Sequence, residues 1–69
     1  MISKEKSFVV FCLENYKAHR ALTGKQTLEL FSKFGVLDYL EEFYDILHTT
    51  GYQYINNDID IYLKARKAF

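Results

Sequence analysis

The chain contains no proline and no tryptophan, and it has only one cysteine and three glycines among its 69 residues. Without proline, no helix is interrupted from within, so long helices are allowed. The single Cys12 cannot form a disulfide within the chain. Long hydrophobic runs are also missing, since the longest, FVVFCL at 8–13, is far shorter than the roughly 20 residues of a membrane-spanning helix. We therefore expect no membrane insertion.

The small size of the chain limits its stability. We expect a single domain, residues 1–69, because a unit of this size already buries only about 60% of the surface that its unfolded chain exposes. Such a core rarely supplies more than roughly 3 to 5 kcal/mol without disulfides, metal or a partner chain, so a homo-oligomer such as a dimer is expected. A hydrophobic content of 49% excludes intrinsic disorder. No signal-peptide cleavage pattern follows Lys4 to Lys6, which predicts a cytoplasmic location.

Charged residues are unevenly distributed, although the net charge is zero. Residues 1–33 hold six Lys or Arg and three Asp or Glu, whereas residues 34–63 hold six Asp or Glu and no Lys or Arg. The chain then closes with three basic residues, Lys64, Arg66 and Lys67. The acidic stretch is interpreted either as the solvated outer face of a helix, with the basic end suiting the negative end of a helix dipole, or as a docking surface for a basic partner.

Local signals mark two helices in the first half of the chain. Ser3 is a favourable N-cap for a helix that runs to about Arg20, and TGKQ at 23–26 fits a capping box that starts a second helix. Gly35 is suited to end that second helix, near Phe34, in the left-handed conformation. Apolar residues at helical spacing are expected in the core, together with His19 alongside them: Phe8, Val9, Cys12, Leu13 and Tyr16, then Leu28, Leu30, Phe31 and Phe34.

The second half predicts two further helices. DYLE at 38–41 fits another capping box, and Gly51 is suited to end the helix that follows. YQYI at 52–55 fits an extended turn, and Asn56 or Asn57 is expected to cap a last helix, although DIDI at 58–61 also permits a strand. Short connections favour an all-α fold, a small antiparallel bundle of four helices. The apolar positions are Leu40, Phe43, Tyr44, Leu47, Ile59, Tyr62 and Leu63, and the outward acidic ones are Asp38, Glu41, Glu42 and Asp45.

The triplet His48-Thr49-Thr50 has two interpretations. A histidine beside hydroxyl groups is a candidate for general acid/base catalysis. However, the only cysteine lies on an apolar stripe and the chain has no Gly-x-Ser-x-Gly nucleophile motif. The alternative places His48 in the last turn of a helix, where the dipole favours it, with both threonines hydrogen-bonded to nearby backbone. We favour this helix-end interpretation.

Metal and cofactor motifs are not found. Asn56, Asp58 and Asp60 share the 1, 3, 5 spacing of a calcium-binding loop, but its sixth position is Ile61 instead of glycine and its twelfth is Lys67 instead of glutamate. We interpret these polar residues as a helix cap and its first turn. No Cys or His pair has zinc-ligand spacing, so no metal or cofactor is expected.

Nucleic-acid binding is also disfavoured. The segment around Gly35 resembles a helix-turn-helix in outline, but its second helix would present four carboxylates and no Lys or Arg to the phosphates. A weaker alternative uses four basic residues near the first turn: Lys17, Arg20, Lys25 and Lys33. Scattered basic residues are more often simply solvent-facing.

Aromatic residues indicate a recognition surface. Six Tyr and six Phe are more rings than so small a core encloses, so some rings are expected at the surface. Tyrosines bordered by carboxylates suit protein recognition, because rings supply contact area at little entropic cost. The alternative is that they lie flat at the edge of the core with their hydroxyls in water. The predicted contact residues are Tyr39, Glu42, Tyr44, His48, Tyr52 and Tyr54.

Four segments, FCLENYK, LTGK, ELFSKFGVLDYLEEFYDILHTTG and QYINNDIDIY, resemble a family of short bacterial proteins of unknown function. Members of that family are often encoded beside an ADP-ribosyltransferase-like toxin gene. The resemblance covers nearly the whole chain and implies a non-catalytic accessory or neutralising partner, with no catalytic residues to carry over.

Three functional hypotheses follow. The leading one is a non-catalytic module that binds another protein, antitoxin-like, through the helix after Gly35 and the segment HTTGYQYI at 48–55. The second is a structural homo-oligomer without a separate partner. The third is a small enzyme that uses His48, which would require a concave pocket joining this residue to a carboxylate such as Asp45 or Asp58.

Overall fold

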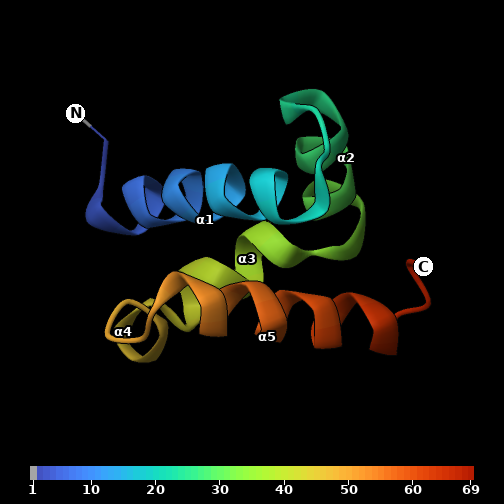
Figure 1. Cartoon of the computed structure of the whole chain (residues 1–69). Helices are drawn as coiled ribbons and strands as arrows, with labels where there is room; N and C mark the ends of the chain where they lie inside the picture. The colour runs from blue at the N-terminus through green and yellow to red at the C-terminus, as the bar shows by residue number, and fades with distance from the viewer. Residues whose placement is uncertain (1) are drawn as a thin grey trace.

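A computed structural model describes residues 2–69, and this part of the chain is helical without any strand. It contains five α-helices, α1 (Lys4–Arg20), α2 (Gly24–Phe34), α3 (Val36–Glu42), α4 (Tyr44–Leu47) and α5 (Tyr52–Ala65) (Figure 1). The prediction of an all-α fold is therefore confirmed, and the strand interpretation of DIDI is wrong. The number of helices is five instead of the predicted four.

The first two helices begin and end where their sequence signals predict. The Ser3 hydroxyl accepts a hydrogen bond from the Lys6 amide, and Thr23 and Gln26 form the complete capping box. These caps satisfy backbone amides that would otherwise lack partners in the first turn. Gly35 ends α2 with a φ of 74°, a left-handed conformation that favours glycine.

The junction between α2 and α3 is a single residue. Gly35 is both the C-cap of α2 and the N-cap of α3, so α3 begins at Val36. The predicted capping box at 38–41 is therefore wrong, because Asp38 already lies within the first turn of α3. The left-handed glycine turns the chain from α2 into α3 without any intervening loop.

The predicted third helix is broken at Phe43. The backbone of this residue leaves the helical region, with a φ of −100° and a ψ of 21°, and separates α3 from α4. No proline or glycine marks this point in the sequence. After the break Leu47 is buried, as Leu40 is before it, and Tyr44 packs edge-on against Phe8 at 5.3 Å between ring centroids. Tertiary packing on both sides of the break accounts for the interruption.

The last helix begins earlier than predicted. Gly51 is the N-cap of α5 in an extended conformation, so it does not end the preceding helix, and YQYI forms the first turn of α5 instead of an extended turn. Asn56 and Asn57 lie inside the helix and do not cap it. Ile55, Ile59 and Leu63 are all buried, and their spacing of four explains why the helix extends back to Tyr52.

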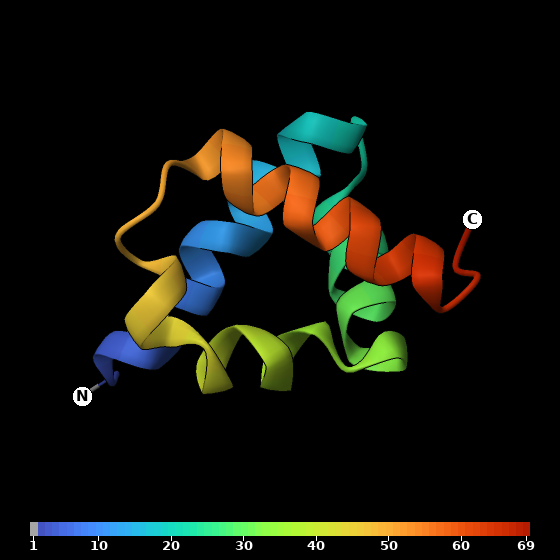
Figure 2. The same cartoon turned by 90° about the horizontal axis from the view of Figure 1, so that it is seen from below.

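The helices surround one core without forming a regular antiparallel bundle. α1 contacts α2, α3 and α5, while α2 also contacts α3. In Figure 1 both α1 and α5 run from left to right, and Figure 2 shows that they cross, so the antiparallel arrangement is not confirmed. The core side chains come from every helix: Phe8, Val9, Cys12, Tyr16, Phe31, Val36, Leu40, Leu47, Ile55, Ile59 and Leu63.

One predicted core position on α2 is wrong. Leu28 is 49% exposed, and its neighbour Thr27 is fully buried instead. The Thr27 hydroxyl donates a hydrogen bond to the Thr23 carbonyl at 2.8 Å, so its burial leaves no unsatisfied polar group. Within residues 2–69, no helix has both the length and the apolar character required to cross a membrane.

Candidate functional site

Two of the predicted contact residues, Tyr39 and Glu42, lie one turn apart on α3. Tyr39 is half-buried, and its hydroxyl donates a hydrogen bond to the Asp58 carboxylate on α5. Glu42 is exposed at the last position of α3. Both side chains line the same groove between α3 and α5. The structure therefore brings these two residues together.

Tyr44 and His48 form a second pair, on α4 and its C-cap. Their rings stack at 4.4 Å between centroids and 5° between planes, while His48 Nδ1 lies 2.7 Å from the Tyr44 carbonyl oxygen. The Thr49 and Thr50 hydroxyls each donate to a backbone carbonyl three residues earlier, at 2.8 Å. The helix-end interpretation of this triplet is confirmed.

The pocket that an enzyme using His48 would require is not observed in this region. None of the three grooves identified among residues 2–69 is lined by His48. The Asp58 carboxylate is bound to Tyr39, and Asp45 is exposed on α4. None of these three grooves therefore joins His48 to Asp45 or Asp58.

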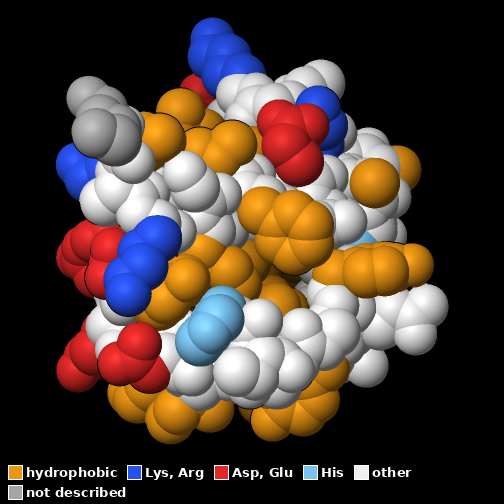
Figure 3. Space-filling model, turned by 90° about the vertical axis from the view of Figure 1, so that its left-hand side faces the viewer, with side chains coloured by type: hydrophobic (Ala, Val, Ile, Leu, Met, Phe, Trp, Pro, Cys, Tyr) orange, Lys and Arg blue, Asp and Glu red, His pale blue; other side chains and the backbone are white. Residues whose placement is uncertain are grey.

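Tyr52 and Tyr54 lie in the first turn of α5 and are 52% and 59% exposed. Neither ring belongs to an aromatic pair in the described part of the chain. Figure 3 shows the face of the molecule beyond the left-hand end of Figure 1, where hydrophobic side chains are exposed around a histidine and carboxylates lie at the edge. The structure therefore places Tyr39 and Glu42 in one groove and stacks Tyr44 on His48, while Tyr52 and Tyr54 are exposed in the first turn of α5.

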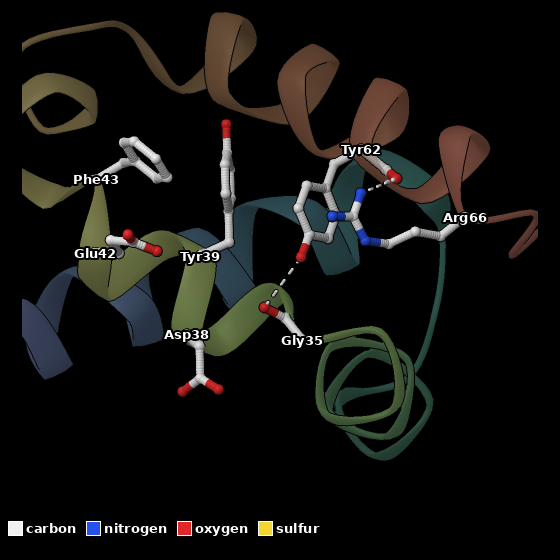
Figure 4. Close-up of a pocket in the computed structure, with 7 residues that line it drawn as sticks. All are labelled: Gly35, Asp38, Tyr39, Glu42, Phe43, Tyr62 and Arg66. Atoms are coloured by element: carbon white, nitrogen blue, oxygen red, sulfur yellow. Dashed lines mark hydrogen bonds between the residues drawn. The ribbon is translucent and has the colours of Figure 1, made fainter.

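The groove between α3 and α5 is the largest hollow among those identified, at about 580 Å³. Figure 4 shows the residues that line it, which come from the α2–α3 junction, from α3 and its end, and from the C-terminal part of α5: Gly35, Asp38, Tyr39, Glu42, Phe43, Tyr62 and Arg66. It is open to solvent on one side. The groove therefore combines aromatic rings with charged groups of both signs.

Aromatic rings form a continuous row along this groove. The Tyr39 ring lies 5.1 Å from that of Phe43 and 4.6 Å from that of Tyr62, between ring centroids. The Arg66 guanidinium continues the row, 3.4 Å from the centroid of the Tyr62 ring (Figure 4). These spacings are typical of stacked aromatic and cation–π contacts. The row links α3 to α5, and at its end the Phe43 ring is 38% exposed to solvent.

The carboxylates beside the row have no basic partner. Asp38 and Glu42 are exposed, and neither forms a salt bridge within residues 2–69. Arg66 is the basic residue that lines the groove, and its Nη1 donates to the Tyr62 carbonyl instead of to a carboxylate. The groove consequently carries two carboxylates against one guanidinium.

Asp58 and Asp60 do not belong to the first turn of a helix, contrary to the sequence interpretation. Both lie in the middle of α5, where each carboxylate accepts a hydrogen bond from a tyrosine of another helix. Burial, followed by the hydrogen bond to Asp58, raises the pKa of Tyr39 to about 12. The two aspartates therefore attach α5 to α3 and to α1.

Asp60 is the centre of a network that the sequence did not reveal. Its carboxylate accepts hydrogen bonds from the Tyr16 hydroxyl at 2.6 Å and from Arg20 Nε at 3.0 Å, and His19 Nε2 lies 2.8 Å away. Burial raises the pKa of Asp60, but these hydrogen bonds outweigh it and hold the pKa below its ordinary value. Tyr16 and Arg20 are four residues apart on one helix face, the only sequence signal for this arrangement.

A small polar hollow of about 280 Å³ lies beside this network. It is lined by His19, Gln53, Asn56 and Asn57. Asn56 is only 5% exposed. Its Oδ1 atom has no hydrogen-bond partner in the described part of the chain. Among residues 2–69, no group of three or more His, Cys, Asp or Glu side chains is placed to hold a metal ion.

Comparison with known proteins identifies one related family. A family model described as "Protein of unknown function (DUF3791)" matches residues 7–66 of the chain. No curated protein and no solved structure matches the chain.

Proposed function

Since the chain belongs to the DUF3791 family of proteins of unknown function, we propose from its surface that it is a non-catalytic module that binds another protein. The observation that carries the proposal is the combination of exposed aromatic and aliphatic side chains with unpaired carboxylates on α3, α4 and the start of α5. The proposed contact residues are those that the sequence predicts: Tyr39, Glu42, Tyr44, His48, Tyr52 and Tyr54.

Several large apolar side chains are exposed in this region. Phe43 is 38% exposed, Ile46 is 65% exposed, and Tyr52 and Tyr54 are more than half exposed. Covering such groups with a partner would contribute about 25 cal/mol of favourable free energy for each Å² of apolar surface removed from water. Contiguous exposed apolar surface rimmed by polar groups marks interaction sites in soluble proteins. These side chains therefore favour a protein-binding role.

The charge of the same region supports a basic partner. All four carboxylates of α3 and α4 are exposed: Asp38, Glu41, Glu42 and Asp45. None is paired with a basic side chain in the described part of the chain. A negatively charged surface steers a positively charged partner and excludes acidic ones. We therefore propose that the partner presents Lys or Arg side chains to this face.

The family resemblance adds the identity of the expected partner. In that family an ADP-ribosyltransferase-like toxin gene often stands beside the gene of the small protein, which fits an antitoxin-like role. A neutralising module needs no chemistry of its own, because it acts by covering a surface of the enzyme. The proposed function is accordingly that of a cytoplasmic, antitoxin-like partner of a toxin enzyme.

Co-expression with the product of the adjacent gene tests this proposal. The two proteins are expected to co-elute in size-exclusion chromatography, with a mass by light scattering equal to that of a complex. The double variant Tyr52→Ala/Tyr54→Ala should weaken the complex at least about tenfold, because exposed rings carry much of the energy of protein interfaces. Leu28→Ala, at a similarly exposed position on α2, should leave it unchanged. Two proteins that elute separately would contradict the proposal.

A structural homo-oligomer is a second candidate, favoured by the outer face of α1. Val10 and Phe11 are 52% and 51% exposed there, and their burial in a second copy would add apolar contact that so small a core lacks. Light scattering of the isolated chain separates the candidates. A tight dimer that buries Val10 and Phe11 would support this alternative, whereas a monomer would remove it.

A further inference from the structure

We propose that the groove between α3 and α5 binds an arginine side chain of the partner protein. The guanidinium would lie over the exposed part of the Phe43 ring and pair with the carboxylates of Asp38 and Glu42. This inference rests on the proposed function and specifies the chemistry that the partner must present. Three features of the groove support it: an internal arginine already stacked there, a partly exposed Phe43 ring, and carboxylates that form no salt bridge within residues 2–69.

Arg66 is the internal example of this recognition. Its guanidinium carbon lies 3.4 Å from the centroid of the Tyr62 ring, at one end of the aromatic row. A planar cation is attracted electrostatically by the negative face of an aromatic ring, and the attraction increases where water is excluded. The groove therefore already accommodates one guanidinium on one of its three rings.

The next two rings of the row have no cation of their own. Within residues 2–69, Lys and Arg side chains lie over the rings of Tyr44, Phe69, Phe34 and Tyr62, but none lies over Tyr39 or Phe43. Both rings nevertheless line the groove, and Phe43 is 38% exposed. The Tyr39 ring lies between those of Phe43 and Tyr62, so a guanidinium from another protein could repeat on the exposed Phe43 ring the contact that Arg66 makes with Tyr62.

The carboxylates of the groove indicate that its ligand carries a positive charge. Asp38 and Glu42 lie four residues apart on α3, on either side of Tyr39 in sequence, and both line the groove (Figure 4). Neither forms a salt bridge within the described part of the chain. A phosphate or carboxylate ligand would be repelled by these two groups, whereas a cation gains a charge-assisted hydrogen bond from each of them.

Arginine fits this site better than lysine. The guanidinium is planar, so it stacks on aromatic rings, and its fork of five N–H donors reaches two acceptors at once. An ammonium is a compact, strongly hydrated charge that loses more hydration on entering an aromatic groove. The combination of an aromatic ring and two carboxylates in one groove therefore favours arginine.

A titration with short peptides, followed by NMR of the folded chain, tests the inference without the natural partner. The probe is the tripeptide acetyl-Gly-Arg-Gly-amide, compared with its lysine analogue and with the neutral, nearly isosteric citrulline analogue. We expect the arginine peptide to shift the signals of Tyr39, Phe43 and Glu42, with a dissociation constant of about 1 to 10 mM. The lysine peptide should bind about threefold more weakly, and the citrulline peptide at least about tenfold more weakly.

Matched variants on the same helix test the assignment of the carboxylates. Glu42→Gln should weaken binding of the arginine peptide about threefold to tenfold, because it removes one charge-assisted hydrogen bond. Glu41→Gln changes the net charge equally at an exposed position that does not line the groove, and should leave the affinity unchanged. Equal losses from both variants would show diffuse charge attraction and would overturn the inference.

The remaining outcomes are also decisive. Equal binding of the arginine and citrulline peptides, or shifts centred on Tyr44 and Asp45, would refute the groove assignment. Shifts of groove signals that depend on protein concentration without any peptide would show that a second copy occupies the groove, and would also refute it. A complex that forms in co-expression without any peptide binding overturns this inference and leaves the proposed function intact. Peptide binding without a complex overturns the proposed function alone.

Discussion

The Tyr16 hydroxyl on α1 donates a hydrogen bond of 2.6 Å to the carboxylate of Asp60 on α5, 44 residues further along the chain. Tyr16 is fully buried, and the Asp60 side chain is 18% exposed. Arg20 adds a salt bridge to the same carboxylate, with its Nη2 at 2.9 Å. The first and last helices are therefore joined by one carboxylate that is largely removed from water, and its charge must remain paired for the fold to be stable.

Replacing Asp60 by Asn should destabilise the protein. The substitution keeps the size of the side chain but removes the charge that accepts from Tyr16 and Arg20. Hydrogen bonds to charged groups contribute about 1.5 to 3 kcal/mol, so the free energy of unfolding should fall by about that amount. Urea denaturation followed by circular dichroism measures it. Asp45→Asn, at an exposed site on α4, should stay within about 0.5 kcal/mol of the wild type.

The same network predicts a loss of stability in acid. The pKa of Asp60 is lower in the folded protein than its ordinary value of 3.8. A carboxylate with a lowered pKa stabilises the fold above its unfolded pKa, and this contribution is lost as the pH falls through the folded pKa. The difference in unfolding free energy between wild type and Asp60→Asn should therefore shrink below about pH 4. A difference that stays constant between neutral pH and acid would contradict the assignment.

Two tyrosines should ionise late in alkali. Burial first, and then hydrogen bonds to Asp60 and Asp58, raise the pKa values of Tyr16 and Tyr39 to about 12, from an ordinary value of 10.0. Because the folded pKa lies above the unfolded one, the stabilisation is complete below pH 10 and is lost as the pH rises towards 12. Phenolate absorbance should show Tyr16 and Tyr39 ionising at a higher pH in the folded protein than in urea. In urea, all six tyrosines should ionise together near the ordinary value.

Local signals predicted the first half of the fold well, because each acts within a few residues. The Ser3 cap, the Thr23 capping box and the left-handed Gly35 are formed as expected. The position of His48 at the end of a helix was predicted for the same reason, since the Thr49 and Thr50 hydroxyls donate to carbonyls only three residues earlier. Features set by neighbouring backbone groups can be derived from the sequence alone.

Features that depend on distant packing could not be derived in this way. The break at Phe43 has no glycine or proline, and it is accounted for by burial of Leu40 and Leu47 on either side. The partners of Asp60 are at least 40 residues away in the chain, so no spacing rule connects them. The row from Phe43 through Tyr39 and Tyr62 likewise joins two helices. Only the early start of α5 had an available signal in the sequence, because Ile55 and Ile59 are four residues apart, as on one face of a helix.

Cys12 should be unreactive in the folded protein. It is 1% exposed, and burial raises the pKa of its thiol to about 12, so very little thiolate forms at neutral pH. Iodoacetamide should therefore alkylate it only through opening of the structure, at a rate at least about a hundredfold slower than in urea, as measured by mass spectrometry. Asp60→Asn should accelerate the reaction because it increases opening. Equal rates in the folded and unfolded protein would show that α1 does not bury this side chain.

The same substitution at two glycines should have opposite effects on stability. Gly51, the N-cap of α5, has a φ of −75° and a ψ of 157°, almost the same as Ser3 and Thr23, but it lacks their side-chain hydrogen bond. Apart from its chain neighbours, no atom of residues 2–69 lies within 4 Å of a Cβ placed there, so Gly51→Ser should add a cap and stabilise the fold by about 0.5 to 1 kcal/mol.

Gly35→Ser is the matched comparison, because Gly35 has a φ of 74° that disfavours any residue with a Cβ. It should destabilise the fold by about 1 to 2 kcal/mol, although a Cβ there would meet only the Tyr62 hydroxyl at an ordinary 3.5 Å. Urea denaturation of both variants measures the two effects on one scale. Stabilisation by Gly35→Ser would mean that the α2–α3 junction is not left-handed, and destabilisation by Gly51→Ser would mean that α5 does not begin at Tyr52.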